Sequence, residues 1–301
     1  MAAGSAQKMR PDQDSVTLVR RAAPAKLNLY LHVLGRREDG YHLLDSLVAF
    51  ADIADVVAAR PAPALSLEIT GPFASGLRDD LSANLVWRAA MALARRAGIE
   101  PRAALALEKN LPVASGIGGG SSDAAAALKA LGELWRLDLG ERQFQGLAES
   151  LGADVPVCLF GEPAWVGGIG EAVAPAPPLP PCSVVLVNPG LSLATPAVFK
   201  TRAGAFSEPA RFETAPTDAA ALARLLQARR NDLTPAALAL APEISEVLRA
   251  LGAEVGALMA RMSGSGATCF ALFADEGASR ASARRLQAAH PGWWVAVGKL
   301  L

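Results

Sequence analysis

The amino-acid sequence predicts an α+β fold in two parts, and three patterns support this prediction. Residues 26–33, KLNLYLHV, alternate apolar and polar side chains, and this period of two is typical of a half-buried strand. Residues 84–97 carry leucine and alanine at helical spacing, and Gly98 stands where such a helix would end. The segment 172–181, AVAPAPPLPP, is too rich in proline to form a packed helix, so it marks the boundary between the parts. The expected division is a disordered tail, a first domain and a second domain, at residues 1–15, 16–175 and 176–301.

The first part is expected to begin with strands and to continue with helices. After the strand at 26–33, Asp39-Gly40 is a common hairpin dipeptide. Further strands are expected at residues 44–50, 55–59, 65–70, 103–108 and, in the apolar run VPVCLF, 155–160. Besides the helix at 84–97, one helix is expected after the glycine-rich run, with Leu128, Leu131 and Trp135 on its apolar stripe. A second is expected to end near Leu151.

The second part mixes strands and helices in the same way. Strands are expected at residues 183–188, on either side of the SGSG run at 263–266, and at 293–297. Helices are expected near residues 195–204, 217–228, 242–251 and 276–289. Because both parts contain both kinds of element and no internal repeat is present, the α+β class holds for the whole chain.

Composition excludes several classes of protein. The chain of 301 residues is 51% apolar and its charges balance, 29 basic against 29 acidic, so no basic field attracts nucleic acid or an anionic membrane. No run approaches the length of a membrane span, and the first residues lack the pattern of a secretory signal. Cys158, Cys182 and Cys269 lie far apart in apolar runs, which favours reduced thiols over zinc or disulfides. We therefore expect a soluble, cytoplasmic protein.

A glycine-rich loop is the most informative motif. In residues 112–127, PVASGIGGGSSDAAAA, the glycines and serines stand between an expected strand and an expected helix. Glycines let backbone N–H groups turn inward, and a helix N-terminus attracts anions. A plain turn is the alternative, but four glycines and three serines within residues 115–122 exceed what a turn requires. The loop is neither a Walker A motif nor G-x-G-x-x-G, so it indicates a phosphate site without naming the ligand.

Three other features gain meaning only beside this loop. Lys26 starts the first strand after Pro24 and Ala25; alone it would be read as a solvated lysine. Asp154, in GADVPV, is either a local cap or a catalytic carboxylate. The segment 264–266 in MSGSGA is either a hairpin turn or a second place where backbone approaches a ligand.

Together these segments resemble a known superfamily. PAKLNLYLHVLGRREDGYH, KNLPVASGIGGGSSDAA, LGADVPV and MSGSGA follow one another like the motif blocks of the GHMP kinases, and the resemblance runs from about Ala23 to Ala267. PAKLN, GYH and GADVPV in one chain are most similar to the 4-diphosphocytidyl-2-C-methyl-D-erythritol kinases. The resemblance implies an N-terminal ATP-binding domain, a C-terminal ferredoxin-like α+β domain, and an active site in the cleft between them. It also implies ATP-dependent phosphorylation of the substrate's 2-hydroxyl, with Mg²⁺. The protein is expected to be a monomer or weak homodimer.

The resemblance further implies roles for individual residues. It assigns catalysis to Lys26 and Asp154. The substrate-binding residues it implies are Asn28, Tyr41, His42, Thr195 and Phe199, the aromatic and histidine side chains holding the cytosine base. The ATP-binding residues it implies are Asn84, Lys109, Pro112, Val113, Ala114, Ser115, Gly116, Ile117, Gly118, Gly119, Gly120, Ser121 and Ser122, with Ser122 also a candidate magnesium ligand. The second glycine loop contributes Gly264, Ser265 and Gly266. The family more often has alanine or glycine at position 115 and leucine at 117, but both changes are compatible with the loop.

Three other functions fit the sequence less well. A homoserine, mevalonate or sugar kinase of the same superfamily needs no cytosine clamp, so GYH argues against these substrates. A non-catalytic nucleotide-binding protein would keep the loop, but the presence of both Lys26 and Asp154 disfavours it. A serine hydrolase built on the SGSG run is excluded because no Gly-x-Ser-x-Gly occurs there. Residues 205–240 carry no marker of function.

Overall fold

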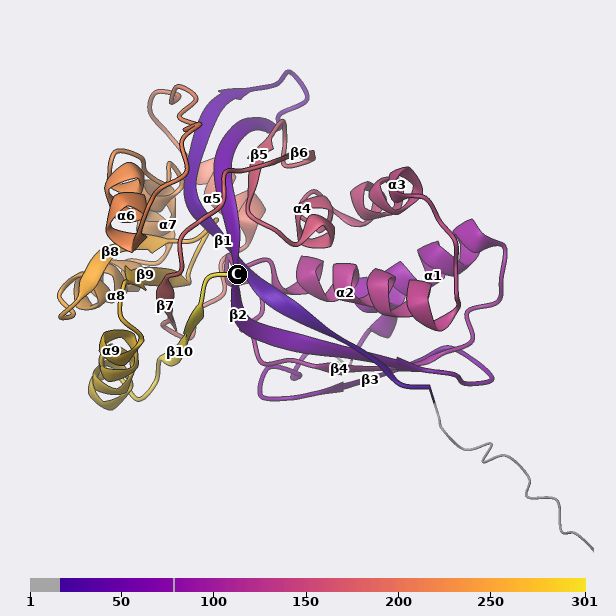
Figure 1. The fold of residues 1–301 in the computed structure, drawn as a ribbon. Coiled ribbons are helices and arrows are strands. Elements are labelled where there is room, and N and C mark those ends of the chain that lie inside the picture. The colour runs from indigo at the N-terminus through magenta and orange to yellow at the C-terminus, as the bar shows by residue number, and fades with distance from the viewer. Residues whose placement is uncertain (1–16, 78) are drawn as a thin grey trace, which may run out of the picture.

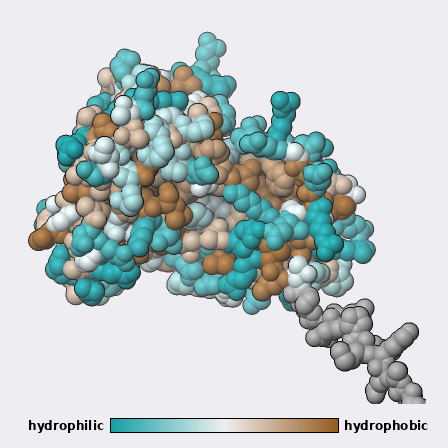
Figure 2. All heavy atoms as spheres, viewed as in Figure 1, coloured by the Kyte–Doolittle hydropathy of each residue, from teal (hydrophilic) through white to brown (hydrophobic). Residues whose placement is uncertain are grey.

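The fold consists of two lobes built around two β-sheets (Figure 1). The structure is a computed structural model that describes residues 17–77 and 79–301, so the expected tail at 1–15 lies outside it. Figure 1 shows helices α1–α4 gathered in one lobe and α5–α9 in the other, while the long strands β1 and β2 extend into both. On the face shown in Figure 2, an indentation separates the two lobes.

The first lobe contains a six-stranded sheet with β2 at its centre. Its strands are β1 (Val19–Arg36), β2 (His42–Arg60), β3 (Ser66–Thr70), β4 (Ala104–Glu108), β5 (Ala164–Gly167) and β6 (Ala172–Pro175). Antiparallel β1 follows one edge of β2 along its whole length. On the other edge β5 pairs with the first half of β2 and β4 with the second half, and β3 adds to β4 in parallel. The helices are α1 (Leu85–Ala97), α2 (Gly119–Leu134), α3 (Glu141–Leu151) and α4 (Val155–Phe160), after a short 3₁₀ turn, η1 (Leu81–Ala83).

The second lobe contains a four-stranded antiparallel sheet. Its strands β7 (Ser183–Asn188), β8 (Ala257–Met262), β9 (Cys269–Phe273) and β10 (Trp294–Lys299) lie in the order β10-β7-β9-β8. Between β7 and β8 come α5 (Thr195–Thr201), α6 (Ala219–Gln227), α7 (Thr234–Leu240) and α8 (Glu243–Gly252), and α9 (Glu276–Ala289) connects β9 to β10. This order of strands and crossovers is the ferredoxin-like arrangement, so the expected topology of this part is confirmed.

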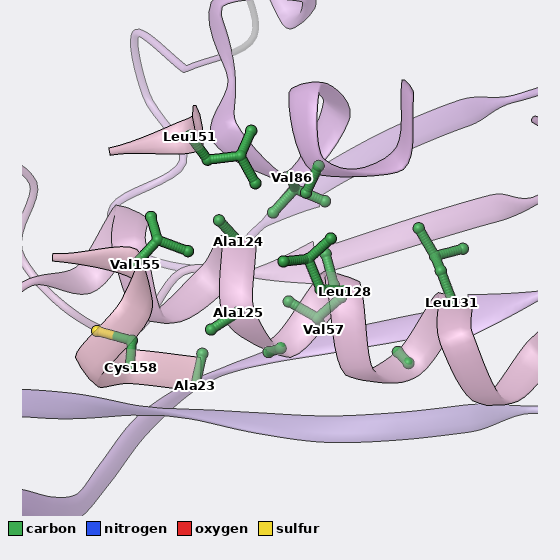
Figure 3. Close-up of a cluster of buried hydrophobic side chains, with 14 of the residues drawn as sticks. Ala23, Val57, Val86, Ala124, Ala125, Leu128, Leu131, Leu151, Val155 and Cys158 are labelled. Carbon is green, nitrogen blue, oxygen red and sulfur yellow. The ribbon is translucent and has the colours of Figure 1, made fainter. Parts of the chain in front are cut away.

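Three clusters of buried apolar side chains hold the elements together. In the first, small residues of α2 such as Ala124 let that helix lie close to α1, α4 and the first sheet; Figure 3 shows Leu128 and Leu131 continuing the same face. The third cluster fills the second lobe. The second cluster joins the lobes, because Leu27 and Leu47 of the first sheet pack with Leu186 and Phe270 of the second. The lobes therefore share buried surface as well as a chain connection.

One expected strand is a helix, which corrects the prediction for VPVCLF. Residues 155–160 form α4, with Asp154 as its N-cap and Gly161 as its C-cap at φ 76°. Pro156 stands in the first turn, where its missing N–H costs no hydrogen bond. The β-branched and apolar composition suggested a strand, but α4 buries Val155 and Val157 beside α2 instead. Local composition cannot separate a short buried helix from a short buried strand.

Other differences concern the extent of elements. The strands expected at 44–50 and 55–59 are one strand, β2, and the strand at 26–33 is the middle of the longer β1. The segment expected to be a proline-rich linker begins as β6, which pairs with β5. Strand β5 and helix α7 were not expected. The first sheet ends at Pro175 and the second begins at Ser183, but the division at 175 stays a prediction.

Candidate active site

A cavity of about 950 Å³ lies between the lobes, and both lobes line it. Its wall is built from β1, the β1–β2 hairpin, the loop before α2, the start of α4, the start of α5 and the loop between β8 and β9. The expected site residues that line it are Lys26, Asn28, Tyr41, His42, Ala114, Ser115, Gly116, Gly118, Gly119, Gly120, Ser121, Asp154, Thr195, Phe199, Gly264 and Ser265. The fold thus brings together motifs that lie as far apart in the sequence as residues 26 and 265.

Lys26 and Asp154 form an ion pair at this cavity. The Lys26 Nζ atom lies 3.1 Å from Asp154 Oδ1. Lys26 is only 4% exposed, whereas 44% of the Asp154 side chain is accessible. Asp154 reaches this place because it is the N-cap of α4, a helix formed by residues that were expected to be a strand. The result is a buried ammonium group beside a carboxylate that a ligand in the cavity can reach.

Asn28 holds the ammonium group of Lys26 from the other side. Its Oδ1 accepts a hydrogen bond of 3.2 Å from Lys26 Nζ, and its Nδ2 donates one of 2.8 Å to Ser46 Oγ. The Ser46 hydroxyl in turn donates to the Tyr30 carbonyl oxygen at 2.6 Å. Because these bonds fix the amide orientation, Oδ1 faces Lys26. Sequence reasoning missed Ser46, since its place within hydrogen-bonding distance of Asn28 depends on the register of β1 and β2.

The glycine loop passes directly over the Lys26 side chain and leads into α2. The Lys26 N–H donates to the Ile117 carbonyl oxygen at 2.9 Å. Gly118 has a left-handed φ of 62°, and a Cβ there would lie 3.0 Å from Lys26 Cβ. Helix α2 then begins at Gly119, with Gly118 as an N-cap that offers no side-chain hydrogen bond. The first N–H groups of a helix have no intrahelical partner and attract anions, so this cradle fits a polyphosphate.

The two glycine loops pack backbone against backbone. A Cβ on Gly116 would lie 2.5 Å from the Ser263 carbonyl oxygen, and one on Gly264 would lie 2.8 Å from the Gly116 carbonyl oxygen. Ser263 Oγ donates to the Gly116 carbonyl oxygen at 2.9 Å, and the Thr268 N–H donates to that of Ser115 at 3.0 Å. No side chain larger than hydrogen fits at these two glycines without displacing backbone. The second loop therefore supports the first from the other lobe.

Some expected ATP-site residues lie outside the cavity wall. Asn84 caps α1, its Oδ1 accepting a hydrogen bond of 2.9 Å from the Val86 N–H. The Ser122 hydroxyl donates to the Pro24 carbonyl oxygen at 2.7 Å, so it faces β1 rather than a magnesium ion in the cavity. The other expected residues that do not line the cavity are Lys109, Pro112, Val113, Ile117 and Gly266. Position in a motif did not reveal which side chains turn inward.

Lys109 lies in a buried ionic cluster beneath the glycine loop. Its Nζ atom is 2.5 Å from Asp55 Oδ2 and 2.7 Å from Asp123 Oδ2. Burial by itself would lower the pKa of Lys109, but the two carboxylates outweigh it and raise that pKa. Burial raises the pKa of Asp123 to about 7, helped by Asp55 and opposed by Lys109. Asp55 Oδ1 also accepts the N–H groups of Asn110 and Leu111, so the cluster ties both ends of the loop to β2.

Aromatic side chains lie at another part of the cavity. The His42 and Phe199 rings are stacked, with centroids 5.1 Å apart and planes 24° apart. Tyr41, at the hairpin, is 60% exposed. Burial lowers the pKa of His42, and the nearby guanidinium groups of Arg36 and Arg202 lower it further, so the ring is neutral near pH 7. Both arginines also line the cavity; sequence reasoning missed them because arginine on a hairpin and after a short helix carries no distinctive signal.

Neither a metal-binding cluster nor a membrane-spanning helix occurs among the residues that the structure describes. Within 17–77 and 79–301, no group of three histidine, cysteine or acidic residues is placed to hold a metal ion. In that same part of the chain, helices that combine the length and the apolar character needed to cross a membrane are absent.

Comparison with known proteins identifies the family. The model of the GHMP kinases N terminal domain matches residues 84–162, and the GHMP kinases C terminal model matches residues 212–292. The 4-diphosphocytidyl-2-C-methyl-D-erythritol kinase of Paramagnetospirillum magneticum is 54% identical over 279 residues, which cover 93% of this chain and 97% of that protein. The chain belongs to this kinase family. It is a small-molecule phosphotransferase with the two-domain GHMP kinase fold, and kinases of this kind use ATP.

Further relatives agree with this membership. The kinase of the same name from Cereibacter sphaeroides strain ATCC 17025 is 56% identical over 278 residues, covering 91% of this chain and 96% of that protein. A crystal structure of 4-(cytidine 5'-diphospho)-2C-methyl-D-erythritol kinase is 36% identical with a TM-score of 0.76, covering 93% of this chain and 98% of its own. Homoserine kinase from Cytophaga hutchinsonii, at 18% identity and a TM-score of 0.73 over 96% and 97% of the chains, shares the fold alone.

Proposed function

We propose that this kinase transfers the γ-phosphoryl group of ATP to the 2-hydroxyl of 4-diphosphocytidyl-2-C-methyl-D-erythritol, in non-mevalonate isoprenoid biosynthesis. The observation that best supports the proposal is a single cavity lined by three functional parts. These are the Lys26–Asp154 pair, the glycine loop and the stacked pair of His42 and Phe199. The family relatives are named as kinases of this substrate, 4-diphosphocytidyl-2-C-methyl-D-erythritol. The reduced state expected of the buried thiols supports a cytoplasmic location.

Asp154 is assigned the removal of the proton from the attacking hydroxyl. Its carboxylate is accessible from the cavity, as a general base must be. Lys26 is assigned the stabilisation of the negative charge that develops on the attacking oxygen, because its Nζ atom lies 3.1 Å from Asp154 Oδ1. Asn28 keeps that ammonium group in place through its bond to Nζ. A buried ammonium group held by two fixed partners needs little reorganisation when charge develops beside it.

The glycine loop is assigned the phosphates of the nucleotide. Gly119, Gly120 and Ser121 line the cavity in the first turn of α2, where N–H groups and the helix dipole favour anions. Mg²⁺, which we expect the reaction to use, would supply neutralisation of the charge on the phosphates, and the loop would hold it only through the bound nucleotide. Neither a carboxylate cage nor the Ser122 hydroxyl is assigned to it, since Ser122 donates to Pro24.

His42, Phe199 and Tyr41 are assigned the cytosine base. A neutral histidine can both donate and accept hydrogen bonds, as recognition of a base edge requires. Its ring now stacks on Phe199, so the base would either extend this stack or separate the two rings. The exposed Tyr41 is free to close over the base from the hairpin. Thr195, whose hydroxyl lies 2.9 Å from that of Ser265, connects this end of the cavity to the second glycine loop.

A direct assay tests the proposed function. The protein is incubated with ATP, Mg²⁺ and diphosphocytidyl-methylerythritol, ADP release is followed, and the product is examined by phosphorus NMR. We expect a new phosphomonoester signal beside the unchanged diphosphate signals. Homoserine, mevalonate and a sugar serve as competing substrates. ADP release that is no faster with the cytidylyl substrate than without it, or faster with a competitor, contradicts the proposal.

A further inference from the structure

A short segment outside the sequence motifs contacts β1, the strand that carries Lys26. Residues 230–232 connect α6 to α7 and lie beside β1, where Leu31 and Asn231 form an isolated parallel bridge. The Leu31 N–H donates to the Arg230 carbonyl oxygen at 3.0 Å, and the Asp232 N–H donates to the Leu31 carbonyl oxygen at 2.8 Å. The segment is thus fixed three residues beyond Asn28 on the strand that carries Lys26.

The side chain of Asn231 extends from this segment to the second glycine loop. Asn231 is only 4% exposed. Its Nδ2 donates to the carbonyl oxygens of Met262 at 2.9 Å and Gly264 at 2.8 Å, while its Oδ1 accepts the Leu233 N–H at 2.9 Å. Both protons of Nδ2 are therefore bonded to carbonyl oxygens at the turn between β8 and β9, which contains the second glycine loop. An aspartate of the same shape would direct a carboxylate oxygen at two carbonyl oxygens, so only an amide satisfies this position.

The loop that Asn231 holds is in contact with the catalytic residues. A Cβ on Gly264 would lie 2.8 Å from the Gly116 carbonyl oxygen and 3.3 Å from Asn28 Oδ1. Asn28 Oδ1 is the atom that accepts the hydrogen bond from Lys26 Nζ. In addition, the Asn28 N–H donates to Ser263 Oγ at 3.1 Å. A shift of Gly264 would therefore disturb both the glycine loop before α2 and Asn28, whose Oδ1 orients Lys26.

We propose that Asn231 is a positioning residue for phosphoryl transfer. Asn231 holds the second glycine loop in the place where that loop orients Asn28, Lys26 and the glycine loop before α2. The proposal rests on the proposed function. Asn231 does not line the cavity, and its side-chain hydrogen bonds go to Met262, Gly264 and Leu233, so its loss should affect the chemical step more than recognition of the base. A misplacement of about 1 Å can cost on the order of 10²-fold in rate. We expect kcat to fall by about 10- to 100-fold, while KM for the cytidylyl substrate changes less than about threefold.

The test compares Asn231→Ala and Asn231→Asp with a matched control in the same lobe. Asp218→Ala removes the N-cap of α6, whose Oδ1 accepts the Ala221 N–H at 2.7 Å, and lies outside the site described above. Loss of such a cap lowers the stability of the fold, so the control reproduces a general loss of stability. Steady-state kinetics are measured where urea titration shows every variant to be folded. Hydrogen–deuterium exchange of residues 263–268 and 115–118 is measured on the free proteins.

The expected result is faster exchange in both loops for the Asn231 variants, by about tenfold, together with the fall in kcat and a nearly constant substrate KM. Asp218→Ala should leave loop exchange and kcat at wild-type values. Wild-type exchange in the Asn231 variants would overturn the proposal, as would faster exchange with an unchanged kcat or the same losses in the control. If the wild-type protein fails to phosphorylate the cytidylyl substrate, the proposed function fails, whereas the exchange data still decide whether Asn231 holds the loops.

Discussion

The accessible carboxylate of Asp154 beside the buried Lys26 predicts the outcome of a single substitution. In Asp154→Asn the amide oxygen can still accept a hydrogen bond from Lys26 Nζ, 3.1 Å away in the native pair, so the local structure should persist. Without the base, kcat should fall by about 10²- to 10⁴-fold, with the ATP KM changed less than about threefold. Steady-state ADP release measures both constants. A variant that keeps more than about a tenth of the wild-type kcat would contradict the base assignment.

The stacked rings predict a different kinetic pattern. His42→Ala or Phe199→Ala removes one member of the pair whose centroids are 5.1 Å apart. Stacking on a base contributes about 1–3 kcal/mol, so KM for the cytidylyl substrate should rise about tenfold or more, with little change in the ATP KM. The two KM values are measured with the other substrate saturating. An unchanged substrate KM in both variants would rule out the cytosine clamp.

The raised pKa of Asp123 predicts that the stability of the folded protein depends on pH. Burial raises its pKa from an ordinary value of 3.8 to about 7, so the folded protein binds this proton more tightly than the unfolded chain. The resulting stabilisation is complete below about pH 4 and is lost as the pH rises through 7. Asp123→Asn removes this dependence and keeps an acceptor for Lys109. The variant should gain more stability over wild type at pH 8 than at pH 5, by at least about 1 kcal/mol, in urea unfolding. An equal difference at both pH values would contradict the shift.

At the scale of elements, the contact between the two glycine loops predicts that one added methyl group is harmful. In Gly116→Ala the Cβ would meet three backbone atoms of the second loop at 2.5–2.8 Å, at a φ of 79°. Backbone cannot move aside as a flexible side chain can, so stability should fall by about 2 kcal/mol or more, with a large loss of kcat. Gly146→Ala in α3 is the control, because a Cβ there meets nothing within 4 Å. It should be neutral or stabilising by up to about 1 kcal/mol. Urea unfolding that ranks the two variants equally would show that the loops tolerate displacement.

The same elements show what sequence reasoning could and could not predict. Period-two alternation located β1, and a helix was correctly expected next to the glycine–serine run, because both patterns depend on local chemistry; α2 nevertheless begins inside that run, at Gly119, rather than after it. The run VPVCLF was wrongly expected to be a strand, since its helical state depends on packing beside α2. The expectations drawn from the motif order include sixteen residues that line one cavity, and the roles of these residues stay predictions. The expectations did not foresee that Lys109 turns into an ionic cluster. Asn231 carried no signal, because its importance comes from a carbonyl oxygen 33 residues away.

At the scale of the whole molecule, the two lobes are joined too closely to behave as independent units. Phe50 of β2 belongs to the core of the first lobe, yet its carbonyl oxygen accepts the Leu301 N–H at 2.9 Å. Next to it, the Leu300 N–H donates to the Cys182 carbonyl oxygen at 3.0 Å, just before β7 of the second sheet. The C-terminal residues thus bridge the sheets, and the shared cluster of Leu27, Leu186 and their neighbours fills the space between them. Separating the lobes would expose this cluster to water.

This shared core predicts that the chain unfolds in a single cooperative transition. Neither lobe can lose its structure without exposing apolar surface that belongs to the other, so partly unfolded states with one intact lobe should be poorly populated. Far-UV circular dichroism and tryptophan fluorescence test this during urea titration. The fluorescence reports on both lobes, because Trp87 and Trp165 lie in the first and Trp294 in the second. We expect the two curves to coincide, with one midpoint. Two separate transitions, or curves with different midpoints, would show that the cavity lies between independently stable domains.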